Sequence, residues 1–220
     1  AAVAREADVL VLAVKPQNLR AVLSELHGLI PSQALVLSII AGARIGLIQD
    51  GLSHRKVARC MPNLPCRIRK GMTVWTVPAE ATTSDAERVR TILGVMGQEI
   101  LVDDESHVDR ATAVNGTGPA IVAEFVKAMF EAAVFVGESR HVARDTVLAT
   151  VIGTAEMIRA SGGDGVHVAQ LIDEVTSPGG TTSRALQVLK KGQFQATLTD
   201  AIDAAYARTK ELGAALELKS

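Results

Sequence analysis

The apolar residues of this chain change their spacing near residue 103, and this change is the strongest constraint on its fold. Before residue 103, short apolar runs alternate with segments in which apolar residues recur every three to four positions. Such alternation predicts a parallel β-sheet covered by helices, because each connection between parallel strands places a helix on a face of the sheet. The expected strands are residues 8–14, 34–40, 56–60, 72–77 and 98–102, with covering helices between the first two and between the last two.

After residue 103 the strand patterns stop, and every apolar pattern has the period of an α-helix. Residues 119–136 are apolar almost all round, which is typical of a helix buried in a bundle or across an interface. Two narrower stripes, at 147–158 and 198–212, predict amphipathic helices. The expected fold class is therefore α/β, with a parallel-sheet domain at 1–103 followed by an all-α domain at 104–220.

Charge and cysteine content exclude several classes of partner. The formal net charge is -1 with both signs mixed along the chain, so we expect no nucleic-acid partner. The most apolar long run, 120–136, carries three charged residues, which argues against a membrane span. Cys60 and Cys66 match no zinc-binding spacing, so we expect reduced thiols in a cytoplasmic protein and no metal site.

Three successive expected strands end in small residues or prolines. The endings read VKPQ after the first strand, Ala-Gly after the second and MPNLP after the third. Ligands of parallel sheets bind at the carboxyl ends of the strands. Each ending alone fits an ordinary turn, but the three together favour a ligand site. Lys15 could meet a phosphate there or remain solvated.

The usual glycine-rich phosphate loops are missing. No G-x-G-x-x-G follows an expected strand, and no G-x-x-x-x-G-K-[ST] occurs. NGTGPA, at 115–120, is the nearest substitute, but it reads first as a tight entry that lets Pro119 begin a helix. A dinucleotide bound to the first half would therefore lack its pyrophosphate loop in this sequence.

The stretch TSPGGTT, at 176–182, precedes an expected helix at 184–191. Pro178 suits the first turn of a helix, with Ser177 or Thr176 as N-cap. The amides that follow would then face an anion at the helix start. A plain cap needs no glycine, since each glycine costs a helix roughly 1 kcal/mol relative to alanine. The nearest lysines are two turns away, so a single carboxylate fits better than a triphosphate.

AVKPQ, MPNLP, GMT, NGTGPA and TSPGGTT occur in that order, and with them the chain resembles the pyrroline-5-carboxylate reductases from Ala2 to about Leu212. The resemblance implies a Rossmann-type domain lacking its N-terminal part, followed by a helical dimerisation and substrate-binding domain. It also implies a homodimer or higher homo-oligomer. The implied reaction is hydride transfer from NADPH or NADH to the C5=N imine of 1-pyrroline-5-carboxylate, which gives L-proline.

The resemblance also implies roles for individual residues. The hydroxyl of Thr182 would hydrogen-bond the ring nitrogen as the catalytic group. The substrate carboxylate would lie on Ser177, Gly179, Gly180, Thr181 and Thr182. The cofactor would be lined by Ala13, Val14, Lys15, Pro16, Ile40, Ala41, Gly42 and Asn63.

The chain departs from the family pattern at several positions. A first strand and its glycine-rich loop would occupy roughly 55 to 60 residues before Ala1, by comparison with a full βαβ unit. Asn115 and Thr117 replace the usual serines of SGSGPA. His167 is kept, as a residue that orients the substrate loop or caps a helix, but Val166 replaces the acid before it.

Two alternatives to this reductase stay open. One is a shortened, non-catalytic dimeric paralogue that keeps the carboxylate-binding loop, although the exposed sheet edge of such a form argues against it. The other is a reductase of the same layout that acts on a different imine or on a β-hydroxyacid. TSPGGTT disfavours the second.

Overall fold

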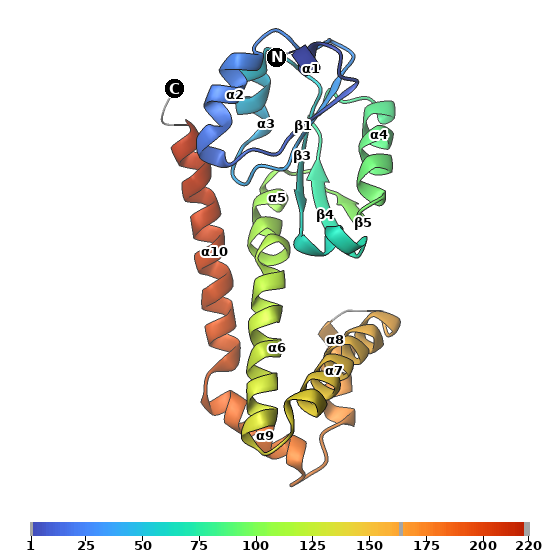
Figure 1. Ribbon diagram of the computed structural model, residues 1–220, viewed down its shortest axis with the longest axis vertical. Helices are drawn as coiled ribbons and strands as arrows, with labels where there is room; N and C mark the ends of the chain where they lie inside the picture. Colours follow the sequence, from blue (N-terminus) through green and yellow to red (C-terminus); the bar gives the residue numbers. More distant parts are fainter. Residues whose placement is uncertain (1, 163–164, 218–220) are drawn as a thin grey trace. The chain divides into compact units, whose positions relative to one another are not determined.

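A computed structural model describes residues 2–162 and 165–217. The chain forms two compact units (Figure 1). The first consists of Ala1–Pro119 together with Ala201–Ser220, and the second of Ala120–Asp200.

A five-stranded sheet of order β1-β2-β3-β4-β5 forms the centre of the first unit. All five expected strands are present, but the expectation of an all-parallel sheet is wrong for one pair, since β3 and β4 run antiparallel. Their connection, residues 63–70, is too short for the crossover of about a dozen residues that a parallel pair needs. The strands are β1 (Val9–Leu12), β2 (Leu35–Ser38), β3 (Val57–Pro62), β4 (Gly71–Thr76) and β5 (Gly97–Leu101).

Helices cover both faces of the sheet. α2 (Leu19–Leu26) and α3 (Ile45–Leu52) lie on one side, and α4 (Thr83–Gly94) lies on the other (Figure 1). The fully buried strand β2 supplies both cores by alternation: Val36 packs in the cluster with α2 and α3, while Leu35 packs in the cluster with α4. Short helices α1 (Ala2–Arg5), η1 (Pro16–Asn18) and η2 (Leu64–Ile68) complete this part.

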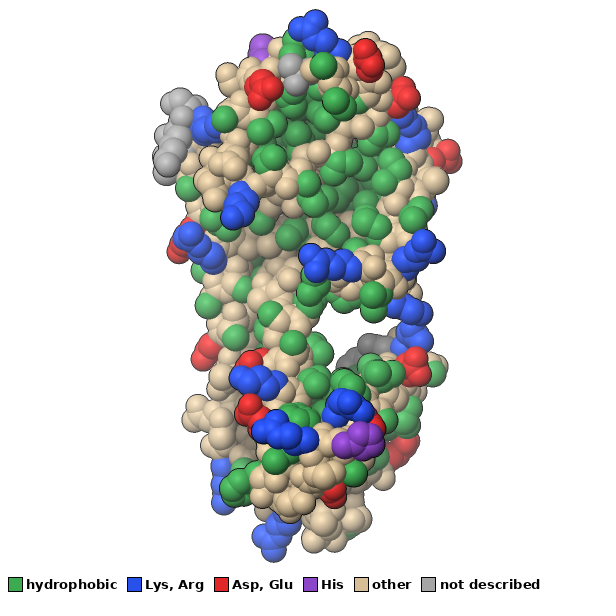
Figure 2. Space-filling view, viewed as in Figure 1, with side chains coloured by type: hydrophobic (Ala, Val, Ile, Leu, Met, Phe, Trp, Pro, Cys, Tyr) green, Lys and Arg blue, Asp and Glu red, His purple; other side chains and the backbone are tan. Residues whose placement is uncertain are grey.

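Strand β1 forms an edge of the sheet. Val11 at its centre is 53% exposed, and apolar side chains gather on the surface over β1 between α2 and α4 (Figure 2). Such an edge is open to pairing with a further strand.

The second half of the chain is helical. The segment α5 (Ser106–Ala111) leads through a π-helical turn, η3 (Thr112–Gly116), into α6 (Gly118–Phe135). As expected, NGTGPA leads into an α-helix with Pro119 in its first turn, but its first residues belong to the π turn, because helical backbone already begins at Ser106. The π turn lies just ahead of Pro119, whose ring would clash with the carbonyl four residues back in a regular α-helix. The remaining helices are α7 (Arg140–Ala160), α8 (Gly165–Glu174), α9 (Thr181–Lys191) and α10 (Phe194–Glu217).

A capping box fixes the start of α4. Thr82 Oγ1 accepts from the Asp85 amide at 3.1 Å, and Asp85 Oδ2 accepts from the Thr82 amide at 3.2 Å. Lys56 Nζ donates to Asp85 Oδ1 at 3.0 Å. Burial alone would raise the pKa of Asp85, but the hydrogen bonds from Thr82 and Lys56 and the charge of Lys56 outweigh it and lower the pKa.

The free energy of unfolding should therefore fall in acid, because Asp85 becomes protonated there. Because its folded pKa lies below the unfolded value, its contribution is complete above pH ~3.9 and is lost as pH falls through the folded pKa. We expect Asp85→Asn to cost about 1 kcal/mol at neutral pH, as for a lost cap, with the difference from the parent shrinking below pH ~4. Urea unfolding at pH 7 and pH 3 measures this, with Glu87→Gln on an exposed position of α4 as control. A cost equal at both pH values would contradict the role of the ionised carboxylate.

Candidate functional site

The carboxyl ends of β1 and β2 lie at one edge of the sheet, because the two strands are parallel and in register. Ala13 and Lys15 are exposed there, Val14 and Pro16 are half-buried, and the chain turns through η1. Within the part of the chain that the structure describes, Lys15 has no ion pair. This segment thus presents an accessible backbone and a free amino group.

The turn after β2 is held more tightly. The Ile40 side chain is only 3% exposed and belongs to the core, so a ligand could reach only its backbone. The Ile40 amide donates to Ser38 Oγ at 3.4 Å, and the Ala43 amide donates to the Ile40 carbonyl at 3.2 Å. Ala41 is half-buried.

Gly42 brings this turn against the C-terminal part of α10. Its φ of +76° lies in the left-handed region, and a Cβ there would stand 2.7 Å from the backbone nitrogen of Gly213. The guanidinium of Arg20 on α2 donates to the Leu216 carbonyl near the end of the same helix. Helix α10 therefore packs backbone to backbone on the turn.

Gly42→Ala should destabilise the first unit strongly. We expect a loss of about 3 kcal/mol in the free energy of unfolding, from left-handed strain together with overpacking against α10. Gly46→Ala in α3 is the matched control, since a Cβ at Gly46 meets nothing within 4 Å and alanine favours a helix by up to ~1 kcal/mol. Chemical denaturation of both variants tests this, and equal stabilities would contradict the close approach.

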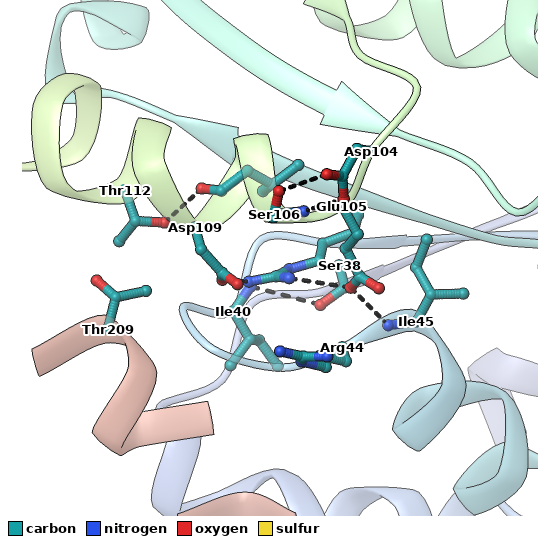
Figure 3. A network of polar contacts seen from close by, with 12 residues as sticks. Ser38, Ile40, Arg44, Ile45, Asp104, Glu105, Ser106, Asp109, Thr112 and Thr209 are labelled. Atoms are coloured by element: carbon teal, nitrogen blue, oxygen red, sulfur yellow. Dashed lines mark hydrogen bonds and ion pairs between the residues drawn. The ribbon is translucent and has the colours of Figure 1, made fainter. Parts of the chain in front are cut away.

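A buried ion network lies beneath the same turn (Figure 3). Arg59 on β3 is 1% exposed, and its guanidinium donates to Glu105 Oε1 at 2.9 Å and to Asp109 Oδ1 at 2.5 Å. Glu105 Oε1 also accepts from the Ile45 amide at 2.9 Å, at the first residue of α3. Glu105 thus joins α5, β3 and the start of α3, and so fixes where the 40–44 turn ends.

Two side-chain amides close the end of the β3–β4 ladder. Asn63 lies directly after β3, half-buried, and its Oδ1 accepts from the Met72 amide at 2.9 Å. Its Nδ2 donates to Asn115 Oδ1 at 2.8 Å. Asn115, in the π turn, donates through Nδ2 to the carbonyls of Met61 and Met72, both at 3.0 Å. The expected position of Asn63 at a strand end is confirmed, but sequence reasoning missed its partner.

In the second unit, α9 starts differently from the expectation. Its N-cap is Gly180, so the predictions of Ser177 or Thr176 as cap and of Pro178 in the first turn are wrong. Thr176 instead donates its hydroxyl to the Ile172 carbonyl at the end of α8. The helix begins at Thr181, three residues earlier than expected.

Backbone geometry accounts for both glycines of this loop. Gly179 has a φ of +71°, and a Cβ at Gly180 would stand 2.3 Å from Ser177 Oγ. Their number is therefore no evidence for an anion, contrary to our sequence argument. The start of α9 is the feature that would suit an anion, because Gly180 supplies no side-chain cap and the first intrahelical bond is Arg184 N–H to Gly180 C=O at 3.2 Å.

The amides of the first turn of α9 consequently lack intrahelical partners. They belong to Thr181, Thr182 and Ser183, and the helix dipole favours negative charge beside them. Thr182 is half-buried, while Ser177 and Thr181 are exposed. The arrangement can hold one small carboxylate and place a hydroxyl next to it.

The remaining residues considered in the sequence are His167, Val166 and the two cysteines. His167 is exposed in α8, and a Cβ added at Gly162 would lie 3.8 Å from its ring. The side chain of Val166 lies outside the described residues. Both cysteines are free, and burial raises the pKa of the Cys60 thiol to about 12. The described residues contain no group of side chains that could hold a metal ion, and no described helix is long and apolar enough to cross a membrane.

Comparison with known proteins finds consistent relatives. Residues 105–212 match the family described as pyrroline-5-carboxylate reductase dimerisation. The chain is 39% identical to pyrroline-5-carboxylate reductase of Synechocystis sp., covering 96% of this chain and 77% of that protein. Its structure is similar to NADP-bound pyrroline carboxylate reductase of Plasmodium falciparum, with a TM-score of 0.88, 32% identity and coverage of 96% and 79%. It is also similar to a Coxiella burnetii pyrroline-5-carboxylate reductase, with a TM-score of 0.83, 34% identity and coverage of 95% and 77%.

Proposed function

Because the chain belongs to the pyrroline-5-carboxylate reductase family, we propose that it reduces the C5=N imine of 1-pyrroline-5-carboxylate, numbered as in proline, to L-proline. The observation that carries this proposal is the start of α9, where three amides lack a side-chain cap and Thr182 is half-buried beside them. Family membership supports the choice of substrate, and the uncapped amides support a carboxylate site at the start of α9.

The chain's own residues bind and orient the substrate. The carboxylate lies in the loop formed by Ser177, Gly179 and Gly180, on the free amides of Thr181 and Thr182, where the helix dipole stabilises it. The Thr182 hydroxyl oxygen accepts a hydrogen bond from the protonated ring nitrogen. Protonation makes C5 the better hydride acceptor, and the fixed ring presents that carbon in one orientation.

The first unit fits the nicotinamide half of NADPH or NADH. When bound, the reduced nicotinamide supplies the hydride. The observation that supports the fit is the edge formed by β1 and β2, where Ala13 and Lys15 are exposed and the next turn is pinned by Gly42. No G-x-G-x-x-G follows a strand in the 220 residues to hold the pyrophosphate. The residues that would line the cofactor are Ala13, Val14, Lys15, Pro16, Ile40, Ala41, Gly42 and Asn63.

A homodimer follows from the second unit. Many of its large apolar side chains are exposed in the single chain, and among the described residues of this unit only Ala143 and Val147 are buried apolar residues. Helices with such faces need a partner surface. The exposed side chains include Val122, Phe125, Ile152 and Val188.

The domain boundary and the cellular location are further parts of this proposal. A division between a cofactor domain, 1–103, and a dimerisation domain, 104–220, is supported by the family match that starts at residue 105. The compact units divide elsewhere, at Ala120 and Asp200. Two free cysteines suit the reducing cytoplasm. A non-catalytic paralogue is not favoured, because the relatives that are 35–39% identical are named as reductases.

The test of the proposed function is NADPH oxidation by the purified chain with 1-pyrroline-5-carboxylate, with NADPH in excess. We expect proline to form in equal amount to the NADPH consumed. When the keto acid that corresponds to a β-hydroxyacid replaces the imine, no NADPH should be consumed. Failure to form proline at any NADPH concentration, or preference for the keto acid, would overturn the proposal.

A further inference from the structure

The β3–β4 hairpin ends at a proline and is completed by side chains. Pro62 pairs with Thr73 and has no N–H to donate to the ladder. Beyond it, the Met72 amide donates to Asn63 Oδ1 rather than continuing the ladder. The carbonyls of Met61 and Met72 accept from Asn115 Nδ2.

Asn115 can make these contacts because of the π turn and its own amide. It lies within η3, and Gly116 beside it lets the turn approach β3, since a Cβ there would stand 3.3 Å from Met61 Cε. One carboxamide both donates to two carbonyls and accepts from Asn63, which is three hydrogen bonds. A serine, as in the family's SGSGPA, has one donor hydrogen and cannot do the same.

We propose that Asn115 is a positioning residue for the cofactor-binding edge, acting through Asn63; this rests on the proposed function. The Asn63 carboxamide has four hydrogen-bonding positions, and the two bonds described above fix its orientation. Because Asn115 Oδ1 accepts one N–H of Asn63 Nδ2, the direction of the other N–H is fixed as well. Among the described residues Nδ2 donates to Asn115 alone, and Asn63 is half-buried, so the second N–H can donate to a carbonyl or hydroxyl of the nicotinamide riboside.

The alternative is that Asn115 only stabilises the hairpin. In that case its removal would lower stability without acting selectively on the cofactor. A double-variant cycle separates the two, since coupling through Asn63 makes the effects on cofactor binding non-additive. The matched control is Thr117→Val, which removes a hydroxyl bond to Thr112 C=O at 3.3 Å within the same helical segment.

The experiment uses the 220-residue chain with Asn115→Ala, Asn115→Ser, Asn63→Ala and the Asn63→Ala/Asn115→Ala pair. The first readout is hydrogen exchange of the Met72 amide without cofactor. The second is the dissociation constant of NADPH by calorimetric titration. We expect Asn115→Ala to speed Met72 exchange and weaken NADPH binding about tenfold each, as for one lost buried hydrogen bond. Asn115→Ser should fall between parent and alanine.

In the Asn63→Ala background, Asn115→Ala should weaken NADPH binding less than twofold further, and Thr117→Val should leave binding unchanged. Unchanged Met72 exchange in Asn115→Ala would overturn the proposal, as would additive effects in the pair. A chain that binds NADPH with this pattern yet forms no proline would refute the proposed function and leave Asn115 as a positioning residue. If Asn115→Ala does not fold, the same comparisons are made with Asn115→Ser.

Discussion

Replacing Thr182 by valine is expected to lower kcat/KM for 1-pyrroline-5-carboxylate about a hundredfold, the usual cost of one preorganised hydrogen-bonding group at a reacting centre. Valine keeps the shape of threonine but cannot accept from the ring nitrogen. The half-buried position of Thr182 in the first turn of α9 allows little solvent to replace the hydroxyl. Steady-state kinetics in both substrates measure the loss, which should appear in kcat/KM for the imine while the KM for NADPH stays within about twofold.

Two further variants test whether the loss is specific to the Thr182 hydroxyl. Thr182→Ser keeps the hydroxyl and should recover most of the activity. Thr150→Val removes an exposed hydroxyl that donates only within α7, to the Thr146 carbonyl at 2.8 Å, and should have no effect. Full activity in Thr182→Val, or equal losses in the valine and serine variants, would contradict the assigned hydroxyl.

Replacing Arg59 by methionine is expected to cost about 3–5 kcal/mol of unfolding free energy, the range for breaking a buried ion pair from one side. Methionine fills much of the volume, but the carboxylates of Glu105 and Asp109 would lose the guanidinium that compensates their charge. Among the described residues, Glu105 would then keep only the hydrogen bond from the Ile45 amide. Urea denaturation followed by circular dichroism measures the loss.

The matched control is Arg208→Met, which breaks an exposed pair with Glu211 whose side chains are 67% and 62% exposed. Such pairs contribute about 0.5 kcal/mol or less. Adding Asp109→Leu and Glu105→Gln to Arg59→Met should recover part of the loss, because no unpaired buried charge then remains. Equal effects of the Arg59 and Arg208 changes would contradict the burial of the network.

The strands and helices of this fold could be predicted because apolar spacing records which face of each element is buried. The β2 run is buried on both faces, and its sequence shows no polar alternation. The antiparallel β3–β4 pair could not be predicted in the same way, because the expected strand ends leave residues 61–71 between them, which is close to the length of a crossover, whereas the observed connection of residues 63–70 is too short to cross the sheet. The π turn was not, because π-helical backbone leaves no spacing pattern of its own and NGTGPA fits an ordinary helix entry equally well.

The sequence predicted where a site could lie but not the contacts that support it. Strand endings indicated a ligand-binding edge of the sheet, which stays a prediction, and the glycines marked the loop before α9, although they serve backbone geometry. The partners of Arg59 lie 46 and 50 residues away in sequence, so spacing cannot pair them. One signal was present: an arginine inside an apolar strand must find acids if it is buried, and Glu105 and Asp109 stand one helical turn apart.

Deuterium transfer tests the central claim most directly. The chain is incubated with NADPH carrying deuterium on the transferring C4 position and with 1-pyrroline-5-carboxylate, and the proline is examined by NMR. We predict one deuterium at C5 of L-proline and none elsewhere. Proline without deuterium, or no proline at all, would contradict the account.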